Sequence, residues 1–192
     1  MKKSFLIAAC AALALGTAQA AGLNWAYLPE VDGYTSLGTK TTAGRQQNIT
    51  LGTKWTVLAN VTFENVSAIT SDWPGVLGVS TNVDNGTNGN LQSPWRVLVN
   101  GGPNTIGATD ASVQNAPVLT NGTHEVAICA DGNTLSYYYD GQLLGSITDA
   151  RVADISAVTW GCQRVNNDGS TFKALPGEWS MDVAYVNGMT YG

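Results

Sequence analysis

Residues 124–146 read HEVAICADGNTLSYYYDGQLLGS, and this stretch decides the fold. It contains three short runs rich in β-forming residues, separated by Asp-Gly-Asn at 131–133 and Asp-Gly at 140–141. Asp-Gly pairs supply the positive φ angles that tight hairpin turns require. The stretch is therefore predicted to form three antiparallel strands joined by two hairpin turns. Because side chains alternate along a strand, the middle strand is expected to turn three of them to one face: Leu135, Tyr137 and Tyr139.

The rest of the chain after residue 21 repeats this pattern. Short β-rich runs, each ended by Gly, Asn, Asp or Pro, occur at residues 55–66, 76–80, 95–99, 157–163 and 179–186. No sustained 3.6-residue apolar period is present, so no long helix is predicted. Many short strands with hairpin connections indicate an all-β sandwich or barrel.

The composition is marked by low charge. Of the 192 residues, 12 % are charged and 44 % are hydrophobic, and there are 22 glycines. The chain is too apolar for a disordered protein and too poor in charged helix formers for a helical bundle. The formal net charge is −5. Because nucleic-acid binding requires a cationic surface, we expect no nucleic-acid partner.

The first twenty residues are predicted to be a cleaved bacterial signal peptide. Lys2 and Lys3 precede eleven apolar residues, Phe5–Leu15, and Ala18-Gln19-Ala20 supplies the small residues before the cut. Eleven residues span roughly 16 Å as a helix, too short to cross a bilayer, so no membrane insertion is expected. Loss of the two lysines leaves seven basic against fourteen acidic residues, a net charge of −7.

Residues 21–192 are predicted to form a single exported domain, located in the periplasm, on the cell surface or outside the cell. One alternative concerns the N-terminus. Ile7-Ala8-Ala9-Cys10 resembles a lipoprotein box, which would leave a lipidated Cys10 at the start of the mature chain.

The motifs at 124–146 resemble the laminin-G-like jelly rolls of the concanavalin A-like lectin/glucanase superfamily. HEVAICADG is similar to the strand of that family that opens His-His-Val-Ala-Val-Val and ends in Asp-Gly. LSYYYDG is similar to the next strand, Leu-x-Leu-Tyr-Val-Asp-Gly, and QLLGS to its Lys-Leu-Val-Gly successor. The resemblance implies a two-sheet antiparallel jelly-roll β-sandwich with a lectin-like function. The closing strand departs from the family, because Asp182 stands alone where the family has Asp-Glu.

Cleavage of the signal would leave two cysteines, Cys129 and Cys162. In an oxidising compartment an isolated pair can form a disulfide, and closing a loop of this length would stabilise by roughly 4 kcal/mol. The alternative is two buried thiols that act as small hydrophobic side chains. Both residues lie in predicted strands, so the sequence leaves the choice open.

Aromatic residues beside predicted turns are the candidate sugar-binding residues. Trp73 precedes Pro74-Gly75, and Trp95 follows Pro94. Sugar rings stack on such aromatic faces, while polar side chains bind the hydroxyl groups. Each tryptophan can instead belong to the core. The polar candidates are Asp84, Asn88, Asn90 and Arg96, with Asn100 close to Arg96.

No cofactor is expected, with structural calcium as an alternative. Residues 84–90, DNGTNGN, begin like a calcium loop, but position twelve is Trp95 where an EF-hand has glutamate. A plain loop is the simpler interpretation, and the metal is left unassigned.

The chain is not expected to be an enzyme. Its single histidine, His124, has no evident nucleophile or carboxylate partner in the sequence, and is interpreted as a strand-start residue. The favoured function is binding of a glycan or cell-surface polysaccharide. The alternatives are a structural or adhesive surface component that binds protein or itself, and a small glycoside hydrolase or lyase.

Overall fold

A computed structural model describes residues 24–28, 45–69, 73–81, 91–92, 94–100, 104–165 and 171–192. The predicted signal peptide, with Cys10, lies outside these ranges, as do Asp84, Asn88 and Asn90. The strands are β1 (Ala26–Tyr27), β2 (Arg45–Asn48), β3 (Lys54–Phe63), β4 (Gly75–Ser80), β5 (Leu91–Gln92), β6 (Trp95–Asn100), β7 (Thr105–Ala108), β8 (Gly122–Asp131), β9 (Thr134–Tyr139), β10 (Gln142–Thr148), β11 (Ala157–Trp160), β12 (Cys162–Val165), β13 (Thr171–Ala174) and β14 (Trp179–Asn187).

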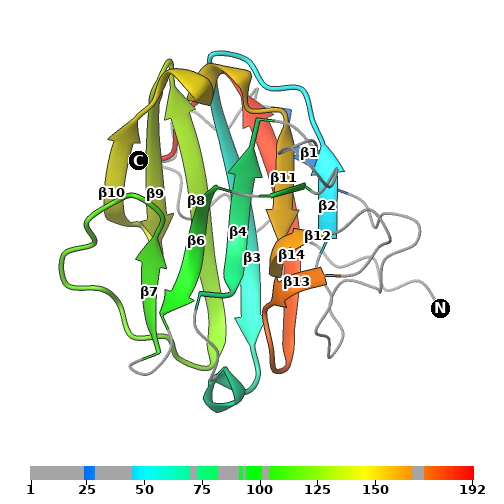
Figure 1. Ribbon diagram of the computed structural model, residues 1–192, viewed down its shortest axis with the longest axis vertical. Helices are drawn as coiled ribbons and strands as arrows, with labels where there is room; N and C mark the ends of the chain where they lie inside the picture. Colours follow the sequence, from blue (N-terminus) through cyan, green and yellow to red (C-terminus); the bar gives the residue numbers. More distant parts are fainter. Residues whose placement is uncertain are drawn as a thin grey trace.

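The strands form two large antiparallel sheets that lie face to face (Figure 1). One sheet has the order β1-β14-β3-β8-β9-β10, and the other has β2-β11-β4-β6-β7. A small sheet, β13-β12-β5, lies beside them. The predicted two-sheet antiparallel jelly-roll β-sandwich is therefore confirmed. In the described ranges the helices are the 3-10 turns Val66–Ala68 and Ala150–Asp154, and none is long and apolar enough to cross a membrane.

The predicted hairpins at 124–146 are present. Strands β8 and β9 pair up to Asp131 and Thr134, which leaves a two-residue turn between them. Strands β9 and β10 are joined by Asp140 and Gly141, with φ angles of 48° and 77°. Positive φ at both turn positions matches the right-handed twist of the strands.

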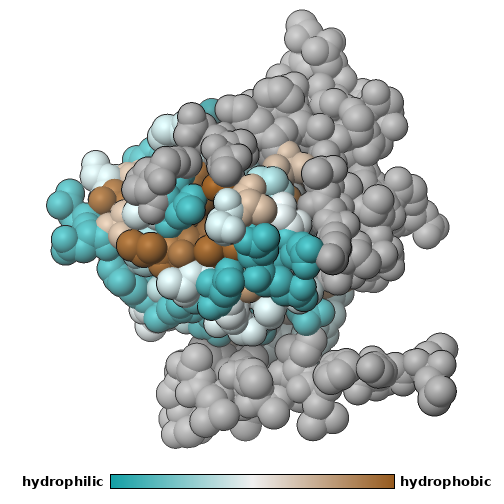
Figure 2. Space-filling view, turned by 90° about the horizontal axis from the view of Figure 1, so that it is seen from below, coloured by the Kyte–Doolittle hydropathy of each residue, from teal (hydrophilic) through white to brown (hydrophobic). Residues whose placement is uncertain are grey.

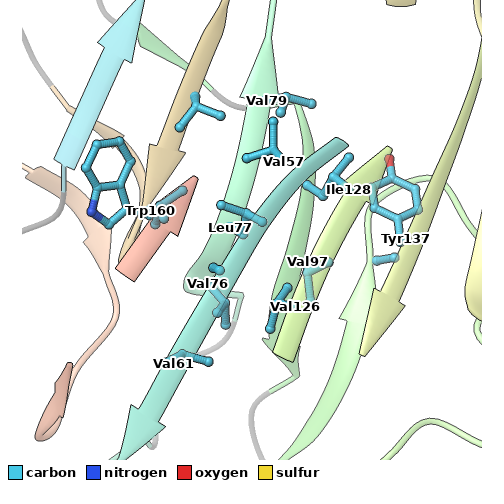
Figure 3. Close-up of a cluster of buried hydrophobic side chains, with 14 of the residues drawn as sticks. Val57, Val61, Val76, Leu77, Val79, Val97, Val126, Ile128, Tyr137 and Trp160 are labelled. Carbon is cyan, nitrogen blue, oxygen red and sulfur yellow. The ribbon is translucent and has the colours of Figure 1, made fainter. Parts of the chain in front are cut away.

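The core fills the space between the two sheets. Leu135 and Tyr137 are 0 % exposed and Tyr139 is 3 % exposed, so the predicted face of β9 points inward. Figure 3 shows side chains of both sheets meeting in this layer, with Val57 and Ile128 from the six-stranded sheet and Leu77 and Val97 from the five-stranded sheet. Seen from below, the coloured residues include a hydrophobic strip bordered by hydrophilic residues (Figure 2).

Cys129 and Cys162 are both buried and are not joined to each other. The structure therefore has two buried thiols here and no disulfide between them. Cys129 lies on the outer face of the six-stranded sheet, in a small cluster with Leu58, Ala127 and Tyr191. Burial raises the pKa of the Cys129 thiol. A buried thiol with a raised pKa carries little thiolate and is chemically inert.

His124 and Asp140, which belong to the motifs at 124–146, contact each other. His124 Nδ1 lies 2.7 Å from Asp140 Oδ2, and its ring stacks on Tyr139 at 5.1 Å between centroids. The other carboxylate oxygen of Asp140 accepts a 2.8 Å hydrogen bond from the Glu125 backbone N–H. His124 Nε2 lies 3.0 Å from the Thr120 carbonyl oxygen. The pair therefore ties the start of β8 to the β9–β10 turn.

We predict that Asp140→Ala lowers the free energy of unfolding by about 1–2 kcal/mol, because two hydrogen bonds are lost and alanine disfavours positive φ. Asp140→Asn should cost less, since asparagine tolerates this conformation and still accepts from Glu125. Urea unfolding of both variants measures the difference. Equal midpoints for the two variants would contradict the prediction.

Candidate ligand-binding site

Strand β6, with the sequence WRVLVN, runs through the candidate site and turns its residues alternately to two faces. Trp95, Val97 and Val99 belong to the core between the sheets. Because alternate residues on a strand face opposite sides, Arg96, Leu98 and Asn100 lie on the outer face of the five-stranded sheet.

The prediction that Trp95 stacks on a ligand is wrong. Its side chain is 1 % exposed and belongs to the core. The guanidinium carbon of Arg151 lies 5.1 Å from its ring centroid. Trp95 and Arg96 are neighbours on one strand, so they face opposite ways and do not contact the same ligand.

Trp73 is placed as a binding residue would be. It is 50 % exposed, and its backbone has a φ of 69°. Few residues other than glycine adopt this conformation, which costs on the order of 1–3 kcal/mol. The Trp73 N–H donates to the Val99 carbonyl at 3.1 Å, and the Val99 N–H donates to the Pro74 carbonyl at 3.1 Å. These bonds hold the indole beside the end of β6.

A hollow of about 220 Å³ opens next to Trp73. Its sheet side consists of Leu98 and Asn100 on β6 and of Gly107 and Ala108 on β7. Its other wall is the segment after β7, which contributes three small or apolar side chains: Ala111, Val113 and Ala116. An exposed indole, one carboxamide and an apolar floor form a surface suited to stacking with a few directed hydrogen bonds.

Gly107 keeps the floor of this hollow open. A Cβ atom at this position would lie 2.8 Å from Asn100 Nδ2 and 3.1 Å from Leu98 Cδ1. Any larger residue would therefore displace the Asn100 carboxamide.

The wall of the hollow is tied to β7 at its base. The Ile106 N–H donates to the Pro117 carbonyl at 2.8 Å, and the Leu119 N–H donates to the Asn104 carbonyl at 2.7 Å. Thr105 and Val118 also form an isolated β-bridge. The segment between these contacts is thus a closed loop beside the β7 edge of the sheet, and its Ala111 and Val113 also pack against the core between the sheets.

Arg96 lies in a polar row beside the hollow. The strand register places Arg96, Gly78, Thr159 and Gln46 in line across β6, β4, β11 and β2. Burial lowers the pKa of the Arg96 guanidinium, and the Asp110 carboxylate partly offsets this effect. Arginine stays charged even so, and Arg96 brings a directional cation to this face.

Of the predicted binding residues, the structure therefore brings Trp73 and Arg96 to one outer face, and Trp95 lies in the core. Leu98, Gly107 and the loop wall were missed. Once Trp95 is assigned to the core, the alternation of WRVLVN alone would have indicated Leu98. No group of three or more His, Cys, Asp or Glu side chains that could hold a metal occurs within the part of the chain that the structure describes.

No protein-family model and no curated protein matches the chain. Several solved structures are similar in shape. A mutant of Trypanosoma rangeli sialidase displaying trans-sialidase activity has 15 % identity and a TM-score of 0.48, covering 69 % of this chain and 20 % of that one. The CBM40 domain of the Ruminococcus gnavus IT-sialidase has 12 % identity and a TM-score of 0.47, covering 79 % of this chain and 90 % of that one.

Alginate lyase AlyC3 in complex with dimannuronate has 14 % identity and a TM-score of 0.40, covering 73 % of this chain and 64 % of that one. The chain thus spans one fifth of the length of the sialidase and less than two thirds of the length of this lyase. At these identities and TM-scores the likenesses assign neither a ligand nor an activity.

We predict that Trp95→Ala lowers the free energy of unfolding by about 3–5 kcal/mol, because it leaves a large cavity between the sheets. Trp73→Ala should change stability by less than about 1 kcal/mol, since half of that side chain is in water. Thermal and urea unfolding of both variants test this contrast. A stable Trp95→Ala protein would show that this tryptophan is not a core residue.

Proposed function

We propose that this protein is an exported, non-catalytic, lectin-like protein that binds a glycan on the outer face of its five-stranded sheet. The observation that carries the proposal is Trp73, a half-exposed indole held at positive φ on the edge of a 220 Å³ hollow. A strained conformation that keeps a large aromatic ring in water supports a functional role for the ring.

The neighbouring residues support the same ligand class. The Asn100 carboxamide can donate to and accept from hydroxyl groups, and Arg96 adds charged donors on the same face. The apolar loop wall, whose side chains are partly exposed, gives the remainder of the hollow a surface for the C–H groups of a sugar ring. Such a combination favours an uncharged, hydroxyl-rich ligand over a purely apolar one.

The absence of catalysis is part of the proposal. The residues that line the hollow, as far as the structure describes them, offer no carboxylate, histidine or cysteine side chain. Hydrolysis of a glycosidic bond commonly uses two carboxyl groups about 5–9.5 Å apart.

We also propose that the chain belongs to the laminin-G-like group, because of the motifs that contain His124 and Asp140.

We predict that the wild-type protein binds its glycan with a Kd of about 10 µM to 1 mM, which corresponds to about 4–7 kcal/mol. Affinity electrophoresis in gels that contain neutral or acidic polysaccharides would identify the ligand. Trp73→Ala should weaken retention at least about fivefold, because the stacking surface is lost. Leu143→Ala is the matched control, since Leu143 is 51 % exposed on β10 of the other sheet.

A second variant tests the floor of the hollow. Gly107→Ala should also weaken retention, through displacement of Asn100. If Trp73→Ala and Gly107→Ala both fold and bind the same glycan as tightly as the wild type, the site is wrongly placed. If no polysaccharide retards the wild-type protein, glycan binding itself is refuted.

Export is likewise proposed from the N-terminal sequence. Secreted protein should have the mass of residues 21–192, with no lipid, as measured by intact mass spectrometry. A retained N-terminus or a diacylated Cys10 would contradict this prediction.

A further inference from the structure

A second hollow lies on the opposite side of the molecule, on the outer face of the six-stranded sheet. Strands β1, β14 and β3 are neighbours there. The hollow is lined by Trp25, Tyr27, Leu58, Asn60, Asp182, Val183 and Ala184. It shares no residue with the Trp73 hollow, so the glycan proposal does not account for it.

The strand register explains its shape. Tyr27, Ala184 and Leu58 lie in one row across β1, β14 and β3. Ala184 is small, so it leaves a depression between its two larger neighbours. The next row on the same face contains Asp182 opposite Asn60. The depression therefore has aromatic and apolar sides and a polar end.

This face of the sheet is acidic. Of the described side chains on it, three are carboxylates, Asp131, Glu125 and Asp182, and one is an ammonium, Lys54. Lys54 Nζ lies 2.8 Å from Asp131 Oδ2, so the one cation is engaged away from the hollow. Glu125 accepts a hydrogen bond from the Tyr191 hydroxyl.

Asn60 lies between Glu125 and Asp182 in the register. With neighbouring strands about 4.8 Å apart, the Glu125 and Asp182 carboxylates are about 10 Å from each other. Both contribute negative electrostatic potential at the polar end of the hollow. Asp182 is exposed on β14, and partial desolvation of its carboxyl raises its pKa. A cation placed beside it would therefore favour the charged carboxylate.

The hollow is small and partly open to solvent. The space in it that a water-sized group can occupy is about 20 Å³, which accommodates a primary ammonium. The rings of Trp25 and Tyr27 can hold a cation through their faces, and their apolar surface can pack an alkyl stem.

We propose that the hollow between Trp25 and Asp182 is a second binding site, which takes a primary ammonium group on an aliphatic stem. Asp182 binds the ammonium, with Asn60 as a further acceptor, and Tyr27 and Leu58 flank the stem. Lysine side chains and free alkylamines share this chemistry. The site is independent of the glycan-binding face.

The test uses the complete exported protein, labelled with ¹⁵N and titrated with n-butylammonium at constant ionic strength. We expect amide shifts centred on residues 25–27, 58–60 and 182–184, with a millimolar Kd. The matched control ligand is n-butanol, which has the same stem without the charge and should bind at least about tenfold more weakly.

Two variants separate the contributions, and unchanged melting temperatures show that each is folded. Asp182→Asn should weaken n-butylammonium binding about tenfold and leave n-butanol unaffected. Tyr27→Leu should weaken it about threefold. Trp73→Ala, which should impair glycan retention, should leave amine binding unchanged.

Equal binding of n-butanol and n-butylammonium would overturn the proposal, as would full affinity in folded Asp182→Asn or no shifts at these residues. Nα-acetyl-lysine methylamide distinguishes the two ligand sources. If it binds at least as tightly as n-butylammonium, the site accepts a protein side chain; weaker binding supports a free alkylamine.

Discussion

Packing of the two sheets against each other divides every strand into residues that face inward and residues that face outward. This constraint determines what each side chain can do. On β6 it sends Trp95 into the core, and it sends Arg96 and Asn100 to the surface. The same alternation on β3 and β14 places Asn60 and Asp182 together on the opposite outer face. Both proposed binding sites are therefore consequences of how the core is filled.

The local parts of the fold could be predicted from the sequence. The turns at 131–133 and 140–141 depend on residues adjacent in the chain, and Asp-Gly chemistry indicates them directly. Alternation on β9 follows from the same short-range rule. The role of the two tryptophans could not be predicted, because both lie next to a proline, and Trp95 begins a predicted strand without a sign of which face it takes. What separates them is the positive φ of Trp73 and the register of β6, and neither can be derived from local sequence.

The walls of both hollows come from long-range pairing. Tyr27 lies beside Ala184 only because β1 pairs with β14, near the other end of the chain. Ala111, Val113 and Ala116 carry no chemical signature that marks them as binding residues. They line a hollow because the loop after β7 folds back beside Leu98 and Trp73. Only the three-dimensional structure shows that such residues line a hollow.

The hydrogen bonds at the base of that loop have a further consequence. Pro117 and Leu119 are bonded to the β7 region, and Thr120 lies against His124, which Asp140 holds in place. The wall of the Trp73 hollow is thus ordered when the domain folds. A preorganised wall loses little conformational entropy when a ligand arrives, so more of the interaction energy is retained as affinity. His124 and Asp140, which lie outside the hollow, would then act on binding through the rigidity of this loop.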